Sequence, residues 1–183
     1  MPNGTGRIVV ALALALLGSC SDGAGPDDVL TDEQAQALLS IVDAKVNESK
    51  EEAELGTGGA FTAVVPCLFK GEVATSGKYT EVEDSTKANY DVDMTMVYTK
   101  CRQGSDAGVF VIEGTVREVS TDKYDLVVLS RALDNRLTGN LDWSLDNASG
   151  SCAIDLTLVV RASPTTQSVD VTGTLCGAPF TSS

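Results

Sequence analysis

The sequence predicts a mainly β protein: an antiparallel meander of seven to nine strands that forms a strongly curved sheet or barrel, with one N-terminal amphipathic α-helix. Apolar residues recur at helical spacing only between residues 32 and 54. After Gly59, apolar and polar residues alternate with period two in runs at hairpin spacing. Gly114, Gly139 and Gly173 fall at inward positions, where glycine indicates strong coiling of a sheet or close approach of another element.

The composition suits one folded domain and excludes several kinds of chemistry. The chain has 183 residues, of which 43% are hydrophobic and 21% charged. It contains no histidine, which excludes serine–histidine and cysteine–histidine nucleophiles, histidine zinc sites and histidine pH switches. The 26 acidic residues outnumber 13 basic ones, for a net charge of −13. This balance disfavours nucleic acid and anionic membrane surfaces as partners, because both attract clusters of Lys and Arg.

The N-terminus has the pattern of an export signal. Arg7 precedes the apolar run 8–17, which is too short to span a hydrocarbon core of about 30 Å but fits the apolar region of a signal peptide. The run ends in Leu17-Gly18-Ser19-Cys20. This tetrapeptide resembles the bacterial lipobox, in which small residues precede the cysteine that receives the lipid.

The resemblance implies a bacterial lipoprotein whose signal peptide, residues 1–19, is removed. Cys20 would then carry acyl chains that anchor the protein in a membrane without a transmembrane helix. Ser21 stands where inner-membrane lipoproteins of enterobacteria carry Asp, so the analogy favours the outer membrane of a diderm cell envelope. Residues 20–30 are predicted to be the lipidated cysteine and a flexible tether, and residues 31–183 a single domain. The alternative is an ordinary secretory leader with an incidental cysteine.

One helix is expected from Asp32 to Glu54. Thr31 and Gln34 have the spacing of a capping box, and acidic residues follow Thr31 where the helix dipole favours them. The expected apolar stripe consists of Ala35, Leu38, Leu39, Val42 and Val46. Glycines at 56, 58 and 59 are expected to stop the helix.

The alternation indicates the strands of this meander, of which the first two are interrupted by Pro66 and Gly77. Their ranges are 61–69, 72–83, 89–99, 110–119, 124–133, 136–145, 152–160 and 169–175. A two-residue turn at Asp134-Asn135 and a loop at 147–150 would place apolar residues of three consecutive strands on one inner surface. That register sets Trp143 opposite Ile154. In the final hairpin, Leu158 is expected opposite Val171 and Ile154 opposite Leu175.

Four cysteines remain after Cys20, and an even number in an exported chain predicts two disulfides. A metal site is the weaker interpretation, because no CxxC spacing or histidine supports it. Three connectivities are possible. We favour Cys67 with Cys101 and Cys152 with Cys176, since neighbouring strands are the natural partners.

Two groups of side chains are candidate sites. In the expected register Asp142 lies opposite Asp155, with Asp125 diagonal to it, so a divalent cation site is conceivable. The alternative is a solvated acidic patch, and without a DxDxDG loop we predict no metal and no cofactor. The second group lies on the apolar face and comprises Met94, Met96, Leu141, Trp143 and Leu156. It would either fill the core or form a wall for a lipid.

The sequence therefore favours an uncharacterised cell-envelope lipoprotein, non-enzymatic, with a structural or protein-interaction role. The alternative is a binding module for an apolar ligand, such as a lipid or acyl chain, in the curved apolar face of the sheet. An enzyme is the third class, and no catalytic motif such as GxSxG or a Walker loop supports it. A filled interior would favour the first class, and an open cavity of several hundred Å³ the second.

Overall fold

The computed structural model describes residues 29–53, 55 and 58–182. The predicted signal peptide, Cys20, most of the tether and Glu54 lie outside the described residues. The elements are α1 (Asp32–Glu52), β1 (Gly59–Pro66), β2 (Lys70–Glu83), β3 (Lys87–Ser105), β4 (Gly108–Asp125), β5 (Ser130–Leu145), β6 (Ala148–Ala162), β7 (Gln167–Leu175) and β8 (Ala178–Ser182).

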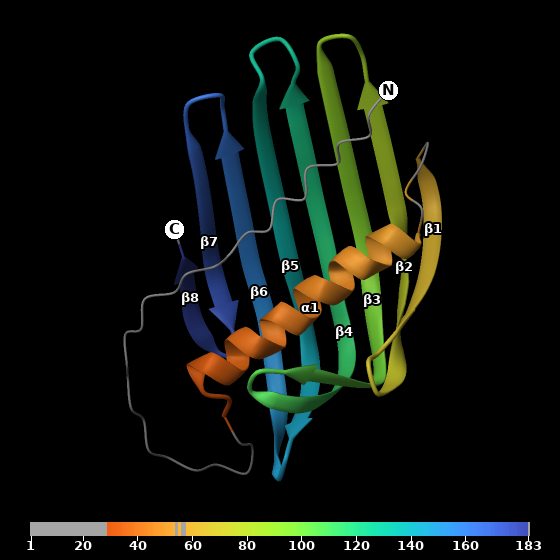
Figure 1. The fold of residues 1–183 in the computed structure, drawn as a ribbon, viewed down its shortest axis with the longest axis vertical. Coiled ribbons are helices and arrows are strands. Elements are labelled where there is room, and N and C mark those ends of the chain that lie inside the picture. The colour runs from red at the N-terminus through yellow and green to blue at the C-terminus, as the bar shows by residue number, and fades with distance from the viewer. Residues whose placement is uncertain (1–28, 54, 56–57, 183) are drawn as a thin grey trace.

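All eight strands form a single antiparallel sheet in the order of the sequence, from β1 to β8. The sheet is curved and does not close, so the predicted mainly β meander is confirmed and its curved-sheet form, not the barrel, is realised. Helix α1 lies across one face of the sheet (Figure 1). No helix in the described part of the chain combines the length and apolarity needed to cross a membrane.

The helix begins where the sequence predicts. The backbone N–H of Gln34 donates to Thr31 Oγ1 (3.3 Å), and the backbone N–H of Thr31 donates to Gln34 Oε1 (3.0 Å). This reciprocal capping satisfies two N–H groups that the first turn leaves without helical partners. The helix is described to Glu52, two residues short of the predicted end.

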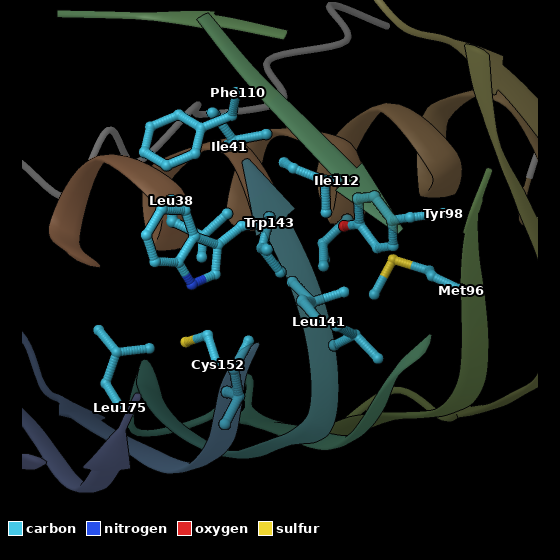
Figure 2. Packing of buried hydrophobic residues seen from close by; sticks show 14 of the residues in the cluster. Leu38, Ile41, Met96, Tyr98, Phe110, Ile112, Leu141, Trp143, Cys152 and Leu175 are labelled. Atoms are coloured by element: carbon cyan, nitrogen blue, oxygen red, sulfur yellow. The ribbon is translucent and has the colours of Figure 1, made fainter. Parts of the chain in front are cut away.

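The core lies between α1 and the sheet. Leu38 and Val42 are completely buried, and Figure 2 shows Leu38 beside Trp143 and Ile41 beside Phe110. The buried stripe of the helix includes Ile41 together with Lys45 and Ser49, whereas Leu39 is only partly buried. Lys45 is tolerated there because its Nζ donates to Glu48 (2.6 Å) and to the carbonyl of Pro66 (3.0 Å).

Both predicted disulfides are present. Cys67 joins Cys101 and Cys152 joins Cys176, with Cα atoms 5.4 and 4.0 Å apart. The expected pairs Leu158–Val171 and Ile154–Leu175 are also confirmed. Cys176 follows β7 in the turn to β8, with a positive φ of 51°. Its backbone N–H donates to the carbonyl of Ala153 (2.8 Å), which brings it beside Cys152.

The predicted turn at Asp134-Asn135 is wrong. Both residues lie inside β5. The predicted strand 124–133 contains the end of β4, the turn and the start of β5, and the predicted strand 136–145 is the rest of β5. The turn is at residues 126–129, where Asp125 Oδ1 accepts the backbone N–H groups of Val127 (3.0 Å) and Val128 (3.1 Å). An aspartate before the loop therefore closes a turn made of apolar residues, which a search for polar turn residues overlooks.

The next turn differs as well. It occupies Asp146 and Asn147 alone, so Trp143 pairs with Gly150 instead of Ile154. The shift is an even number of residues, so each side chain stays on the face that was predicted for it. Between β5 and β6 the assignment of inward and outward faces is therefore correct although the register is not, whereas Ala132, predicted on the face of Leu137, lies in the same strand on the opposite face.

The sheet extends beyond the helix, which divides it into two ends (Figure 1). We call the part beneath α1, which includes Trp143 and both disulfides, the covered end. The open end is the opposite part, where the β2–β3, β4–β5 and β6–β7 hairpins turn.

Candidate functional site

The apolar candidates come together in the core. Met94, Met96 and Leu141 have no exposed surface, and Trp143 and Leu156 expose only 4% and 5% of theirs. Side chains of α1 fill the space above this part of the sheet (Figure 2). These residues therefore pack against each other and against the helix, and they do not form the wall of an open apolar cavity.

The three acidic candidates are not brought together. Asp142 lies opposite Glu113 and Ser151, not opposite Asp155. Asp155 is opposite Thr138 and accepts from the Arg136 guanidinium (3.1 Å). Asp125 is engaged in its own turn. The predicted juxtaposition was wrong because it rested on the incorrect register, and among the described residues no group of carboxylates and cysteines has the arrangement of a metal site.

A row of aromatic side chains crosses the helix-facing side of the open end. Tyr79 stacks on Tyr90, with ring centres 6.4 Å apart, and Tyr90 meets the edge of Tyr124 at 5.8 Å. The guanidinium of Arg131 lies 5.3 Å from the centre of the Tyr124 ring. We call these four residues, one from each of β2 to β5, the tyrosine ladder. Contacts of this kind between neighbouring strands stabilise a sheet.

The polar ends of the ladder bond to residues of the same sheet. Arg131 holds the Asp122 carboxylate with both Nε and Nη2, the shorter contact being 2.7 Å. The Tyr124 hydroxyl donates to the same carboxylate at 3.0 Å. Burial, followed by the negative charge of Asp122, raises the pKa of Tyr124 to about 12. Burial and a hydrogen bond to Glu81 raise the pKa of Tyr79 as well. Neither phenol is poised for acid–base chemistry near neutral pH.

Glu118 connects the helix to the middle of the sheet. Its side chain is completely buried, and Oε1 accepts from Lys50 Nζ and Asn135 Nδ2, both at 2.7 Å. Oε2 is buried without a hydrogen-bond partner. A carboxylate that is closed off from solvent in this way fixes the end of α1 to β4 and β5, and it has no path to a substrate.

The turn between β4 and β5 is the most exposed apolar segment of the open end. Leu126, Val127, Val128 and Leu129 expose 42%, 70%, 59% and 70% of their surfaces. We call these four residues the exposed tip. Besides its two bonds to Asp125, the tip is tied to the neighbouring hairpin, because the backbone N–H of Leu126 donates to the carbonyl of Thr86 (2.8 Å). The tip is thus an ordered turn that directs aliphatic side chains into solvent.

An open hollow of about 630 Å³ lies beside the tip. Its lining gathers residues from five strands, β3 to β7, and the loops between them, mostly from positions that point away from the helix. Four basic residues line it, Lys87, Lys123, Arg131 and Arg161, together with Asp125, although the guanidinium of Arg131 is held by Asp122 and Tyr124 on the helix-facing side. The sequence contains no run of basic residues, so only the fold reveals this cluster. We call it the basic hollow.

The sequence analysis missed both the ladder and the tip. Period-two alternation already placed Tyr90 on the inner face, but the incorrect turn moved Tyr124 to a different strand. For the tip, the sequence offers one signal, an aspartate followed by four aliphatic residues. The aliphatic residues predicted a strand, and the aspartate was not recognised as the start of a turn. Comparison with models of protein families, with curated proteins and with solved structures finds no match to this chain.

Proposed function

We propose that this protein is a lipid-anchored, non-enzymatic protein of the cell envelope with a structural or protein-interaction role. The anchor is proposed from Arg7, the apolar run and Leu17-Gly18-Ser19-Cys20. Two disulfides fit an exported chain, because such bonds persist in oxidising compartments. We place the protein at the outer membrane on the basis of Ser21.

The single observation that carries the proposed role is that the chain fills its own interior. Leu38 and Val42 occupy the space that an acyl chain would need, and both are completely buried against the sheet. An apolar ligand would have to displace the helix, at the cost of exposing these side chains to water. The filled interior therefore favours a protein that acts through its surface over a carrier of apolar ligands.

The arrangement of polar groups supports a non-enzymatic role. The tyrosine ladder is engaged within the sheet, and Glu118 has no access to solvent. Catalysis by these groups would need a substrate within hydrogen-bond reach and a pKa near the working pH.

Metabolic labelling with a tagged fatty acid tests the anchor. We expect the protein to carry the label and Cys20→Ser to lose it, while the matched variant Ser19→Ala retains it. Continued labelling of Cys20→Ser would refute the lipoprotein interpretation. Fractionation of inner and outer membranes tests the proposed location. We expect the unchanged protein in the outer membrane and the Ser21→Asp variant in the inner membrane.

Mass spectrometry of the purified protein under native conditions tests the filled interior. We expect the mass of the polypeptide with its covalent acyl groups and no further lipid in stoichiometric amount. A fatty acid or phospholipid that remains bound through native desalting would favour the alternative, a binding module for an apolar ligand.

A further inference from the structure

We propose that the exposed tip is a second membrane contact, which dips into the interface of the same bilayer that holds the lipid anchor. The inference rests on the proposed lipid anchoring for its geometry. It adds a contact surface of the folded domain, a ligand class, which is phospholipid, and an orientation of the sheet on the membrane.

The composition of the tip is unusual for its position. The two other turns at the open end are polar: residues 84–86 are Asp-Ser-Thr and residues 163–166 are Ser-Pro-Thr-Thr. The tip instead presents four consecutive aliphatic residues to solvent. Leu129 also has a positive φ of 55°, a conformation that favours Gly or Asn over Leu. A strained turn that exposes apolar side chains points to a function outside the isolated domain.

The charges around the tip permit contact with a phospholipid surface. Lys87 and Lys123 are exposed in the basic hollow beside it. Asp122 and Asp134 pair with Arg131 and Arg161 at 2.7 Å, and Asp84 and Asp125 accept backbone N–H groups of their own turns. Glu81 and Glu83 lie at the same end of β2. Four bases thus lie among these six acids, so the contact depends on the aliphatic side chains of the tip and not on a net positive charge. Charges farther than the Debye length of about 8 Å are largely screened at physiological salt. The two lysines remain to meet lipid phosphates.

The length of chain outside the structure favours a bilayer as the occupant. Cys20 lies nine residues before Val29, so an extended tether spans at most about 30 Å. The domain cannot leave the membrane by more than this, and a weak second contact then benefits from a high effective concentration. A narrow, protruding aliphatic turn also suits insertion among lipid headgroups, since a protein partner would have to provide a matching recess.

The same lengths define the orientation. Helix α1 begins near β8 at the covered end, whereas the tip lies at the opposite end of the strands, where β4 turns into β5 (Figure 1). β5 has 16 residues and therefore measures about 50 Å. The tether is shorter than the strand, so the anchor and the tip reach one bilayer only when the strands are tilted toward its surface, with the tip lowest and the covered end above it.

A tryptophan placed in the tip tests the contact. We expect Val127→Trp, in the full lipidated protein reconstituted in vesicles of phosphatidylcholine with phosphatidylglycerol, to emit at shorter wavelength than in detergent-free buffer and to be quenched by bromine-labelled lipid. Trp143 is 4% exposed and gives a constant background that the unchanged protein measures. Leu68→Trp is the matched control, because Leu68 is 66% exposed in the turn after β1, at the covered end, and is expected to stay unquenched.

Amide hydrogen exchange tests the contact without an added aromatic ring. In the unchanged protein we expect exchange at residues 126–129 to slow on vesicles, while the polar turn 163–166 is unaffected. The double variant Lys87→Gln/Lys123→Gln should reduce this protection on vesicles that contain phosphatidylglycerol and leave it unchanged on phosphatidylcholine alone.

Three other outcomes separate the two proposals. A fatty-acid label on the protein with an unquenched Val127→Trp and unchanged exchange would overturn the tip contact and leave the lipid anchor intact. Protection of the tip in native membranes but not in protein-free vesicles would overturn it in favour of a protein partner. A quenched tip in a protein that carries no fatty-acid label would support the contact and refute the proposed anchor.

Discussion

The two ends of the sheet are built from the same strands but are held by different interactions. At the covered end a helix supplies a second apolar wall, and both disulfides connect neighbouring segments there. At the open end no helix of the described residues lies over the strands, and the tyrosine ladder and ion pairs hold them together (Figure 1). One long sheet can therefore concentrate its core in one part and leave the other part free to present a surface.

The magnitudes of these interactions differ. Full burial of an aliphatic side chain contributes about 1.5–3 kcal/mol, and the covered end buries many of them. An aromatic pair adds about 0.5–1.5 kcal/mol and an exposed ion pair less than about 1 kcal/mol. We therefore expect the covered end to determine global stability, and the open end to exchange its amide hydrogens more readily through local opening.

The largest effect is expected from a charge beneath the helix. Leu38→Asp would bury a carboxylate without a partner in the centre of the core, and we expect it to lower the free energy of unfolding by about 4 kcal/mol. Ala44→Asp, on the exposed side of the same helix, is the control and should cost well under about 1 kcal/mol. Urea denaturation measures both. Equal midpoints for the two variants would show that α1 does not pack on the sheet.

Loss of a disulfide should be the next largest effect. Cys152→Ala/Cys176→Ala removes a cross-link between residues 24 positions apart, and we expect a loss of about 3 kcal/mol. Titration of free thiols in the unfolded, unreduced protein should find none among the four cysteines. Exchange measurements on the double variant should show faster opening at β6 and β7 near the covered end, with the tyrosine ladder unaffected. Faster exchange confined to the ladder would contradict this division of the sheet.

The tyrosine ladder should contribute less, and its contribution is pairwise. Tyr90→Ala and Tyr124→Ala should each destabilise the protein, with a coupling energy between them of about 1 kcal/mol in a double-mutant cycle. A second double-mutant cycle, with Tyr79→Ala and Tyr98→Ala, is the control. The rings of these two residues do not contact each other, so their coupling energy should be near zero. Equal coupling energies in both cycles would contradict the claim that direct ring contacts in the ladder stabilise the open end.

The covered end could be predicted well from the sequence. Thr31 and Gln34 identify the start of the helix, and the spacing of Leu38, Val42 and Val46 identifies its buried stripe, because both signals are local. The pairing of the four cysteines followed from strand adjacency in a meander. Inward and outward faces were also correct from Leu137 to the end of β7, since the register errors there were even numbers of residues, but Arg131 and Ala132 lie on the faces opposite to those predicted.

The open end could not be predicted in the same way, because its features depend on which strands turn where. Residues 126–129 have the composition of a strand, and the turn depends on the hydrogen bonds that the backbone N–H groups of Val127 and Val128 donate to Asp125. With that turn misplaced, the predicted register separates Tyr124 from Arg131, which are paired in the structure. It also pairs Asp142 with Asp155, which are not paired in the structure. The basic hollow collects side chains that are scattered along the chain, so composition alone suggested that no such cluster exists.

The smallest effect we predict is a gain in stability at the open end. Leu129 adopts a positive φ of 55°, which costs an L-residue with a bulky side chain about 1 kcal/mol but is tolerated by Asn. Leu129→Asn should therefore raise the free energy of unfolding by up to about 1 kcal/mol, because it relieves strain and removes no buried contact. Leu126→Asn is the matched control, because it makes the same substitution at the other end of the tip, where φ is not positive. It should not raise the free energy of unfolding. If Leu129→Asn is neutral or destabilising while Leu126→Asn behaves in the same way, the aliphatic side chains of the tip stabilise the domain itself, and their exposure would no longer indicate an external contact.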